Sequence, residues 1–468
     1  MNFRSLTISL FVILLSWTST STISLAQENN QTKTYLKTVK AIIDTAMLDG
    51  KAFSMLAELC NDIGPRLSGS PQAAAAVEWS RQVMVDYGLD NVHLQPVLVP
   101  HWIRGNIEEA AIINSPTLGT APLTISALGS SIGTPEMGVV AEVIEVKSLE
   151  EVKQLGKKAK GKIVFYNRPI DPRTMNTFAG YGGAVDQRTR GAVEAAKVGA
   201  VAVLVRSVTT RLDKVPHTGV MHYEENVSKI PAAAISTVDA NLLSNVLKND
   251  EKVSVRIALN CLQKPDIISY NVIGEIKGHE KPDEVVVLGG HLDSWDVGHG
   301  AHDDGAGCVQ AIEALRLIKI LDLKPKRTVR VVLFMCEEFG LRGGPAYADS
   351  VENSGATHIA AIESDRGGLT PRGFSINTDS TTFDKIKRCA PLFEAIDTNH
   401  FIKGGGGPDI SPLRKLSVTT IGLLVDYHRY FDYHHSDNDV LETVNERELE
   451  LGAVAMAILG YWLAMEGI

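Results

Sequence analysis

Cysteine is scarce in this sequence, and its placement excludes the structural roles that cysteine often takes. The 468 residues include five cysteines, an odd number, and none has the paired spacing of a zinc ribbon or a redox motif. A disulfide framework is therefore not expected, and the cysteines in apolar segments are predicted to be small core residues. The five are Cys60, Cys261, Cys308, Cys336 and Cys389.

Clusters of basic residues are also absent. The formal net charge is -9, and no local group of Lys and Arg offers a footprint for nucleic acid. The glycine-rich stretch "KGGGGP" at residues 403–408 lacks the Lys-Ser/Thr pair of a phosphate-binding loop. Nucleic-acid binding is excluded as the main function, and nucleotide binding at this stretch is disfavoured.

No apolar run is long enough to span a bilayer comfortably. Near the N-terminus, Arg4 is followed by "LTISLFVILLSW" and by the small-x-small pattern Ser24-Leu25-Ala26, which predicts a signal peptide over residues 1–26. The C-terminal "LGAVAMAILGYWLAM" is predicted to be a closing amphipathic helix packed on a core. We expect no stable membrane insertion and an exported protein, secreted or periplasmic, or lysosomal in a eukaryotic cell.

The remaining chain divides by texture. Residues 34–60 and 73–89 carry apolar positions at helical spacing, and residues 118–265 consist of short β-like runs, loops and helices almost free of His and acid clusters. From residue 266 onward, apolar strands alternate with helices, a pattern typical of an α/β domain with a mostly parallel central sheet covered on both faces. The prediction is a catalytic domain in two parts, 27–117 and 266–468, and an inserted domain at 118–265 that does not carry the chemistry. The start of the first part is left open as a propeptide.

Acids and histidines follow successive predicted strands of the last part. Ligands bind at the carboxyl ends of the strands in open α/β sheets, so these residues are expected to meet at one edge. Each alone is weak evidence, because a lone acid or histidine has ordinary structural roles. The residues are His291 and Asp293, Asp303 and Asp304, Glu337 and Glu338, Asp365, and His434 and His435.

So many buried acids predict a metal centre, because without a cation their charges would destabilise the fold. Imidazole and carboxylate with no thiolate fit zinc or a similar first-row metal better than calcium or magnesium. The number of ligands exceeds the need of one zinc ion. Two Zn²⁺ ions per chain, sharing a bridging carboxylate, would use them all.

The order of motifs resembles a known family. "GPRLSGS", "HLDSWD", "DDGAG", "EEFGLRG", "ESD" and "YHHSDND" are similar to the zinc-dependent aminopeptidases and carboxypeptidases with co-catalytic metals, closest to the plasma glutamate carboxypeptidase branch, which acts on dipeptides. The likeness covers nearly the whole chain after the signal peptide. It also identifies residues 118–265 with the protease-associated domain inserted in many members.

The resemblance implies a role for each site residue. Asp303 would bridge two zinc ions, with His291 and Asp365 on one, and Glu338 and His435 on the other. Glu337 would be the general base that activates the metal-bridging water. Asp293 would orient His291, and the peptide bond between Asp303 and Asp304 would be cis.

Some assignments rest on details of the motifs. His435 is preferred to His434 because the family pattern is His, Ser or Thr, two residues and an acid. Relatives often have Tyr just before that histidine to stabilise the oxyanion, and His434 stands there in this chain, so His434 and Tyr433 are the candidates. The loop "KGGGGPDISPL", with Gly406 and Asp409, and the inserted domain are where a pocket closed around a free carboxylate would be built.

The predicted function is a secreted di-zinc exopeptidase that hydrolyses dipeptides or short peptides. An aminopeptidase acting on longer peptides is the alternative, because the metal motifs do not distinguish the two. A binding homologue without catalysis is disfavoured, since the ligand set and Glu337 are complete. A homodimer is left open.

Overall fold

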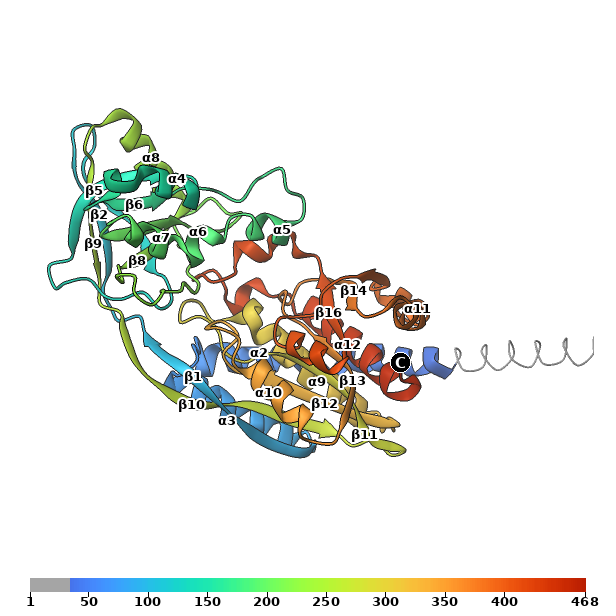
Figure 1. The fold of residues 1–468 in the computed structure, drawn as a ribbon. Coiled ribbons are helices and arrows are strands. Elements are labelled where there is room, and N and C mark those ends of the chain that lie inside the picture. Colours follow the sequence, from blue (N-terminus) through green and yellow to red (C-terminus); the bar gives the residue numbers. More distant parts are fainter. Residues whose placement is uncertain (1–33) are drawn as a thin grey trace, which may run out of the picture.

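The computed structural model describes residues 34–468 and contains two units, each built on an eight-stranded sheet (Figure 1). The predicted signal peptide lies outside the described residues. All five cysteines are buried and unpaired, and the prediction that Cys308 and Cys336 are core residues agrees with the structure.

The main unit has a central block of four parallel strands, from β12 to β16, flanked by antiparallel neighbours. This arrangement confirms the predicted α/β class with a mostly parallel core. In spatial order the strands are β1 (Asp90–Ile103), β10 (Leu262–Ile276), β12 (Arg327–Phe334), β11 (Lys281–His291), β13 (Thr357–Glu363), β16 (Thr419–Val425), β14 (Pro371–Asn377) and β15 (His400–Lys403).

Both faces of this sheet are covered, which explains the continuous apolar runs in its strands. Val286 and Leu288 of β11 belong to the large core that also includes α9 (Ala306–Ile320) and α12 (Glu446–Glu466). The alternate residues Val285 and Val287 belong to a separate core that includes α10 (Gly343–Glu352). Successive side chains of one strand therefore enter different cores.

The C-terminal helix α12 is more deeply buried than an amphipathic helix. Leu449 to Leu459 are buried without interruption. Among the described residues α12 has the length and apolarity of a membrane span, yet 83% of its apolar window is buried inside the molecule. The prediction of a closing core helix therefore agrees with the structure, but the helix is not one-sided.

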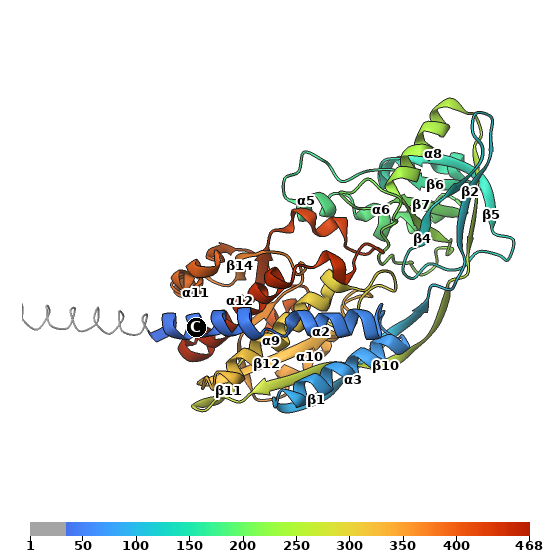
Figure 2. The ribbon, with the colours of Figure 1, turned by 180° about the vertical axis from the view of Figure 1, so that it is seen from behind.

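The predicted first helix is broken in two. Residues 34–49 are helical, Gly50 interrupts, and α2 (Ala52–Glu58) continues into a π turn, η1 (Leu59–Ile63). A Cβ atom at Gly50 would lie 2.4 Å from Cδ of Glu450, so the chain has no room for a side chain there. Figure 2 shows these helices in blue along the back of the main unit, beside α9. The second predicted helix is α3 (Pro71–Asp86), capped by the Ser70 hydroxyl, which accepts from the Ala73 amide at 3.0 Å.

The second unit is inserted between β1 and β10, two long antiparallel strands that lead from one sheet towards the other (Figure 1). Its sheet follows the order β3 (Gly119–Leu123), β2 (Glu108–Ser115), β9 (Ser254–Leu259), β5 (Val139–Val146), β6 (Ile163–Tyr166), β7 (Ala202–Arg206), β8 (Ala232–Ile235) and β4 (Ile125–Ala127). Its helices are α4 (Leu149–Leu155), α5 (Thr177–Gly182), α6 (Asp186–Thr189), α7 (Gly191–Lys197) and α8 (Thr237–Asn249).

The limits of this second sheet differ from the predicted 118–265. The sheet begins at Glu108 and ends at Leu259, because the β2–β3 hairpin pairs with β9 and the following residues already belong to β10. Strands in a hairpin and strands that connect two units both alternate apolar and polar residues, so the sequence pattern does not distinguish them. The side of the second unit that carries α5 faces the main unit (Figure 1).

Candidate metal centre

The predicted site residues meet at the carboxyl ends of the central parallel strands. His291 ends β11, Glu337 and Glu338 follow β12, and Asp365 follows β13. Asp303 lies in the turn η3 (Ala301–Gly305) that leads into α9. Residues 434 and 435 follow η6 (Tyr427–Asp432), the turn after β16.

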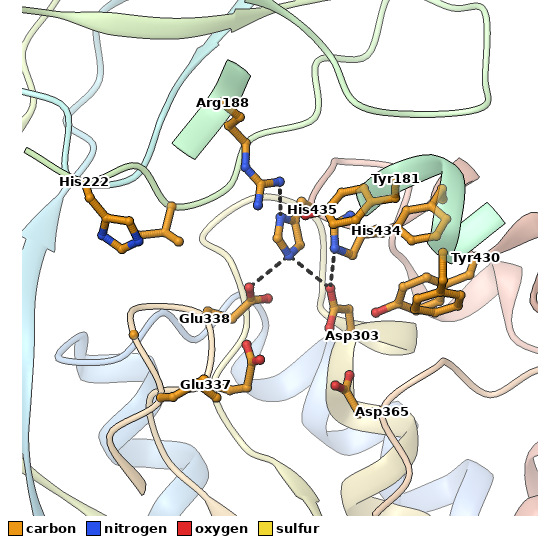
Figure 3. Close-up of a pocket in the computed structure, with 15 residues that line it drawn as sticks. Tyr181, Arg188, His222, Asp303, Glu337, Glu338, Asp365, Tyr430, His434 and His435 are labelled. Carbon is orange, nitrogen blue, oxygen red and sulfur yellow. Dashed lines mark hydrogen bonds and ion pairs between the residues drawn. The ribbon is translucent and has the colours of Figure 1, made fainter. Parts of the chain in front are cut away.

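Asp303 stands between two donor groups. Its Oδ1 is 3.3 Å from Nε2 of His291, and that nitrogen is 3.6 Å from Oδ1 of Asp365. Its Oδ2 is 3.4 Å from Nε2 of His435, and that nitrogen is 2.9 Å from Oε2 of Glu338 (Figure 3). The two oxygens of one carboxylate therefore face two separate sets of ligands.

His434 stays close to the second group. Its ring stacks on that of His435 with centroids 3.5 Å apart, and its Nε2 is 3.9 Å from Oδ2 of Asp303. Asp303, His434 and His435 form one set of ligand atoms within 4.8 Å of one another, and His291, Asp303 and Asp365 form another. The structure places both histidines beside Asp303, while His435 alone contacts Glu338.

Several buried polar atoms here have no hydrogen-bond partner among the described residues, namely Oδ2 of Asp303, Oε1 of Glu338, Nδ1 of His434 and Oδ2 of Asp293. Unpaired buried acceptors are costly, and a cation satisfies them. Burial, followed by the charge of Asp303, raises the pKa of Glu338 well above its usual range. The residues present therefore fit a metal, and the imidazole and carboxylate donors fit zinc.

Glu337 lies in the same cavity as these ligands. Burial is the main cause that raises its pKa to about 8, and the charges of Asp365 and Asp303 add to the shift. A carboxyl group with a pKa near neutrality can both accept and return a proton at physiological pH. Its geometry and pKa suit the predicted role of base.

Asp293 contacts both the imidazole of His291 and the backbone that follows β12. Nδ1 of His291 lies 2.9 Å from the main-chain oxygen of Asp293 and 3.7 Å from Oδ1 of its carboxylate. That Oδ1 accepts from the amides of Cys336 at 2.7 Å and Glu337 at 3.1 Å. The nearer partner of His291 is thus the Asp293 carbonyl, and the carboxylate lies farther away; the predicted orienting role of Asp293 stays a prediction.

The cis peptide bond between Asp303 and Asp304 is present, as the resemblance implied. The Asp304 carboxylate accepts from the amides of His291 and Gly307, both at 3.0 Å. Asp304 therefore ties the end of β11 to the first turn of α9. The Asp439 carboxylate accepts from the amides of His302 at 2.7 Å and Asp303 at 3.1 Å.

Two further residues support the centre and were not assigned roles from the sequence. Arg66 is fully buried and donates to the carbonyls of Leu292 and His299, each at 2.7 Å, and of Gly300 at 2.8 Å. The Trp295 indole donates to Oε2 of Glu338 at 2.6 Å. Arg66 lies within the motif "GPRLSGS", which was the available signal for it.

A cavity of about 340 Å³ opens over the centre, and both units line it. The second unit contributes Phe178, Tyr181, Arg188, Val220 and His222 (Figure 3). The second unit supplies none of the predicted metal ligands, yet it forms one wall of the cavity, in keeping with the expectation that the inserted domain helps to close the pocket. Contacts between residues that are hundreds of positions apart in the sequence cannot be predicted from local composition.

The substrate-binding candidates are placed differently from one another. His434 lines the cavity, whereas Tyr433, Gly406 and Asp409 are not among its lining residues. Tyr433 stacks on the buried His302 at 4.8 Å, and Asp409 is fully buried.

Tyr430 lines the cavity instead, with its hydroxyl on the side of Asp303 (Figure 3). Burial, followed by the charge of Asp303, raises the pKa of the Tyr430 hydroxyl well above its usual range, so the group stays protonated. Three tyrosines in "DYHRYFDYHH" made the choice impossible from sequence.

Comparison with known proteins agrees with this architecture. Residues 271–459 match the sequence model of peptidase family M28. Carboxypeptidase Q of Bos taurus is 38% identical over 92% of this chain and 89% of its own length. The crystal structure of a peptidase M28 precursor from Shewanella amazonensis superposes with a TM-score of 0.88 at 36% identity, covering 93% of this chain and 98% of that one. BSAP, a zinc aminopeptidase from Bacillus subtilis, has the same fold, with a TM-score of 0.66 at 21% identity, covering 89% of this chain and 95% of that one.

Proposed function

The chain belongs to peptidase family M28, and from that premise we propose that it is a di-zinc exopeptidase that hydrolyses dipeptides. The resemblance stated from the motifs is confirmed, and with it the class of enzyme, a zinc metallopeptidase. The number of ions, the role of each residue and the substrate are the proposal.

The position of Asp303 carries the proposal of two ions. Its two carboxylate oxygens face different sets of ligands, which suits a bridging carboxylate. His291 and Asp365 would hold one ion, and Glu338 and His435 the other. When bound, such a pair lowers the pKa of an attacking water and polarises the scissile carbonyl.

Proton transfer is assigned to Glu337. From its place in the cavity this carboxylate takes a proton from the attacking water and returns it to the leaving amine. Tyr430 is proposed to donate a hydrogen bond to the oxyanion, since its protonated hydroxyl faces the centre. Both groups act from the wall without ligating metal.

Arg188 supports a substrate with a free carboxylate close to the scissile bond. It is the one Lys or Arg side chain among the described residues that line the cavity. Its Nη1 donates to the Thr218 carbonyl at 3.2 Å, while its buried Nε has no partner among the described residues. A guanidinium with free donors suits a carboxylate. The name of the carboxypeptidase Q relatives agrees with such a substrate.

Three matched substrates test the proposal. Rates are measured with a dipeptide, its C-terminal amide and the tripeptide that extends it. We expect the dipeptide to give the highest kcat/KM. Equal or faster cleavage of the amide and the tripeptide would establish the aminopeptidase alternative, and no cleavage by the zinc-loaded protein would establish a binding homologue.

Export and assembly remain part of the proposal. The sequence of residues 1–26 supports a signal peptide. N-terminal sequencing of protein recovered outside the cytoplasm should begin near Gln27. Sedimentation of the purified chain tests the homodimer.

A further inference from the structure

The second unit holds the loop that carries His434 and His435 by its own hydrogen bonds. The Thr177 hydroxyl donates to the carbonyl of Tyr427 at 3.1 Å, and the Thr209 hydroxyl donates to that of Phe431 at 2.5 Å. The Thr210 hydroxyl donates to the Asp432 carboxylate at 2.8 Å. These contacts fasten η6 to the second unit before the chain reaches the two histidines.

The tightest part of this contact is a short strip, His217 and Thr218. The Thr218 amide donates to the carbonyl of His435 at 2.9 Å, and Nδ1 of His217 lies 2.7 Å from the carbonyl of His434. Because a carbonyl only accepts, Nδ1 of His217 must carry the proton. His217 and Thr218 are both buried, so neither bond competes with bulk water.

Thr218 also contacts the imidazole ring of His435. Nδ1 of His435 is 3.4 Å from the Thr218 carbonyl, which can only accept. Arg188 is the other neighbour of Nδ1, also at 3.4 Å, and it has only donors, so the two neighbours of Nδ1 favour opposite tautomers. A metal bound at Nε2, which faces Asp303 and Glu338, would leave the proton of neutral His435 on Nδ1, where the Thr218 carbonyl can accept it.

The loop needs this external hold. His435 has a φ of 60°, in the left-handed region that a non-glycine residue adopts only when its surroundings impose it. Its own neighbourhood is a single turn, η6, followed by irregular chain. The bonds from the second unit thus supply what local structure lacks.

We propose that the strip His217–Thr218 of the second unit positions His435 as a metal ligand, so that one metal of the pair depends on the second unit. This inference rests on the proposed function only in assuming that the centre holds two ions. His217 and Thr218 are positioning residues, because they act through the backbone of the loop that carries His434 and His435.

The test compares metal binding by full-length variants. The wild type and His217→Ala are stripped with chelator and titrated with Zn²⁺, and separately with Co²⁺ while its visible absorption is followed. We expect His217→Ala to bind one ion as the wild type does and the second about 10–100-fold more weakly, the usual effect of losing an outer partner of a ligand. The Co²⁺ spectrum of the weakened site should change.

Conservative variants separate positioning from folding. His217→Asn places an amide donor where Nδ1 stood and should restore most of the lost affinity. Thr209→Val removes a bond to the same loop with little change in volume and should weaken the same site. His358→Ala is the matched control, since His358 is also buried and hydrogen-bonded through one ring nitrogen, to Tyr347 at 2.8 Å, but lies outside this contact. It should lower the melting temperature and leave both metal affinities unchanged.

The outcomes are distinct. If His217→Ala and Thr209→Val bind both ions with wild-type affinity, the inference is overturned while the proposed function stands. If the wild type itself binds fewer than two ions, the di-zinc proposal fails and the inference fails with it. Equal weakening in His358→Ala would show a general loss of stability and would also overturn the positioning role.

Discussion

Two adjacent acids, Glu337 and Glu338, lie in different environments, which shows how much a single residue position decides. Both acids line the cavity, but Glu338 is the more buried, contacts His435 at 2.9 Å and accepts from Trp295, whereas Glu337 contacts neither residue. Adjacent side chains at a strand end point in different directions, so one can ligate while its neighbour transfers protons. The Asp293 carboxylate accepts from the Glu337 amide and so holds the backbone at this strand end.

This division predicts different effects of the two substitutions. Glu337→Gln should retain both metals and lose about 100- to 10,000-fold in kcat, because it removes the base and spares the ligands. Glu338→Ala should release one metal. Metal content by mass spectrometry or atomic absorption, measured beside turnover, checks both. Equal loss of zinc from the two variants would contradict the assignment.

Arg188 gives a second prediction at the residue scale. Arg188→Met should raise KM for a dipeptide by roughly 10- to 100-fold, the effect of losing a hydrogen bond to a charged group, and change KM for the dipeptide amide little. Arg188→Lys, which keeps the charge, should fall between. Steady-state kinetics with the dipeptide and its amide measures both KM values. An equal change in KM for the two substrates would show that Arg188 does not recognise the carboxylate.

At the scale of elements, α12 carries a buried acid in an otherwise apolar helix. Glu450 is 4% exposed, and its Oε1 accepts from the amide of Phe53 at 3.2 Å. Burial, followed by the charge of Glu313, raises its pKa from an ordinary 4.5 to about 7. The folded chain therefore holds the proton more tightly than the unfolded chain, and the contribution of Glu450 to stability falls as the pH rises from about 4.5 through 7.

Glu450→Gln should remove this dependence. Above pH 7 we expect the variant to be more stable than the wild type by about 3 kcal/mol, and near pH 4.5 the two should be alike. Urea unfolding at several pH values measures the difference. Glu446→Gln, an exposed position on the same helix, is the control and should show no such change. A constant offset at all pH values would contradict the expected titration.

The loop that follows β11 is held by side chains from other elements. Arg66 donates to three carbonyls of the loop that follows β11, and Asp304 joins the end of β11 to the start of α9. These bonds come from side chains to backbone, so the loop is held by partners distant in sequence. The sequence motif "GPRLSGS" marked Arg66 as part of the family pattern, but only the fold shows what it contacts.

At the scale of the whole molecule, bound metal ions should stabilise the fold, because their positive charge offsets the negative charges of the buried acids. Without them, burial raises the pKa values of Glu337 and Glu338. Folded-state pKa values above the unfolded ones mean that the metal-free protein loses stability as the pH rises through about 8, the value for Glu337.

Chelation should therefore lower the melting temperature more at pH 8.5 than at pH 5.5, these being about the limits of the predicted titration. Differential scanning calorimetry with and without chelator, followed by zinc addition, measures the effect. If the chelator lowered the melting temperature equally at both pH values, the charges of the buried acids would be offset by something other than a metal.

The amino-acid sequence alone was enough to establish the α/β class, the family, and the acids and histidines at the strand ends. Hydrophobic period and local motifs record which strands are buried and which side chains come directly after each strand. The packing of the two units was needed to show that the second unit forms a wall of the cavity with Tyr181 and Arg188, and that Tyr430 rather than Tyr433 faces the centre. These choices depend on how two units meet across long stretches of chain. Local sequence patterns in either unit do not reveal this interface, because the same residue types occur at interfaces and in the core of a single unit.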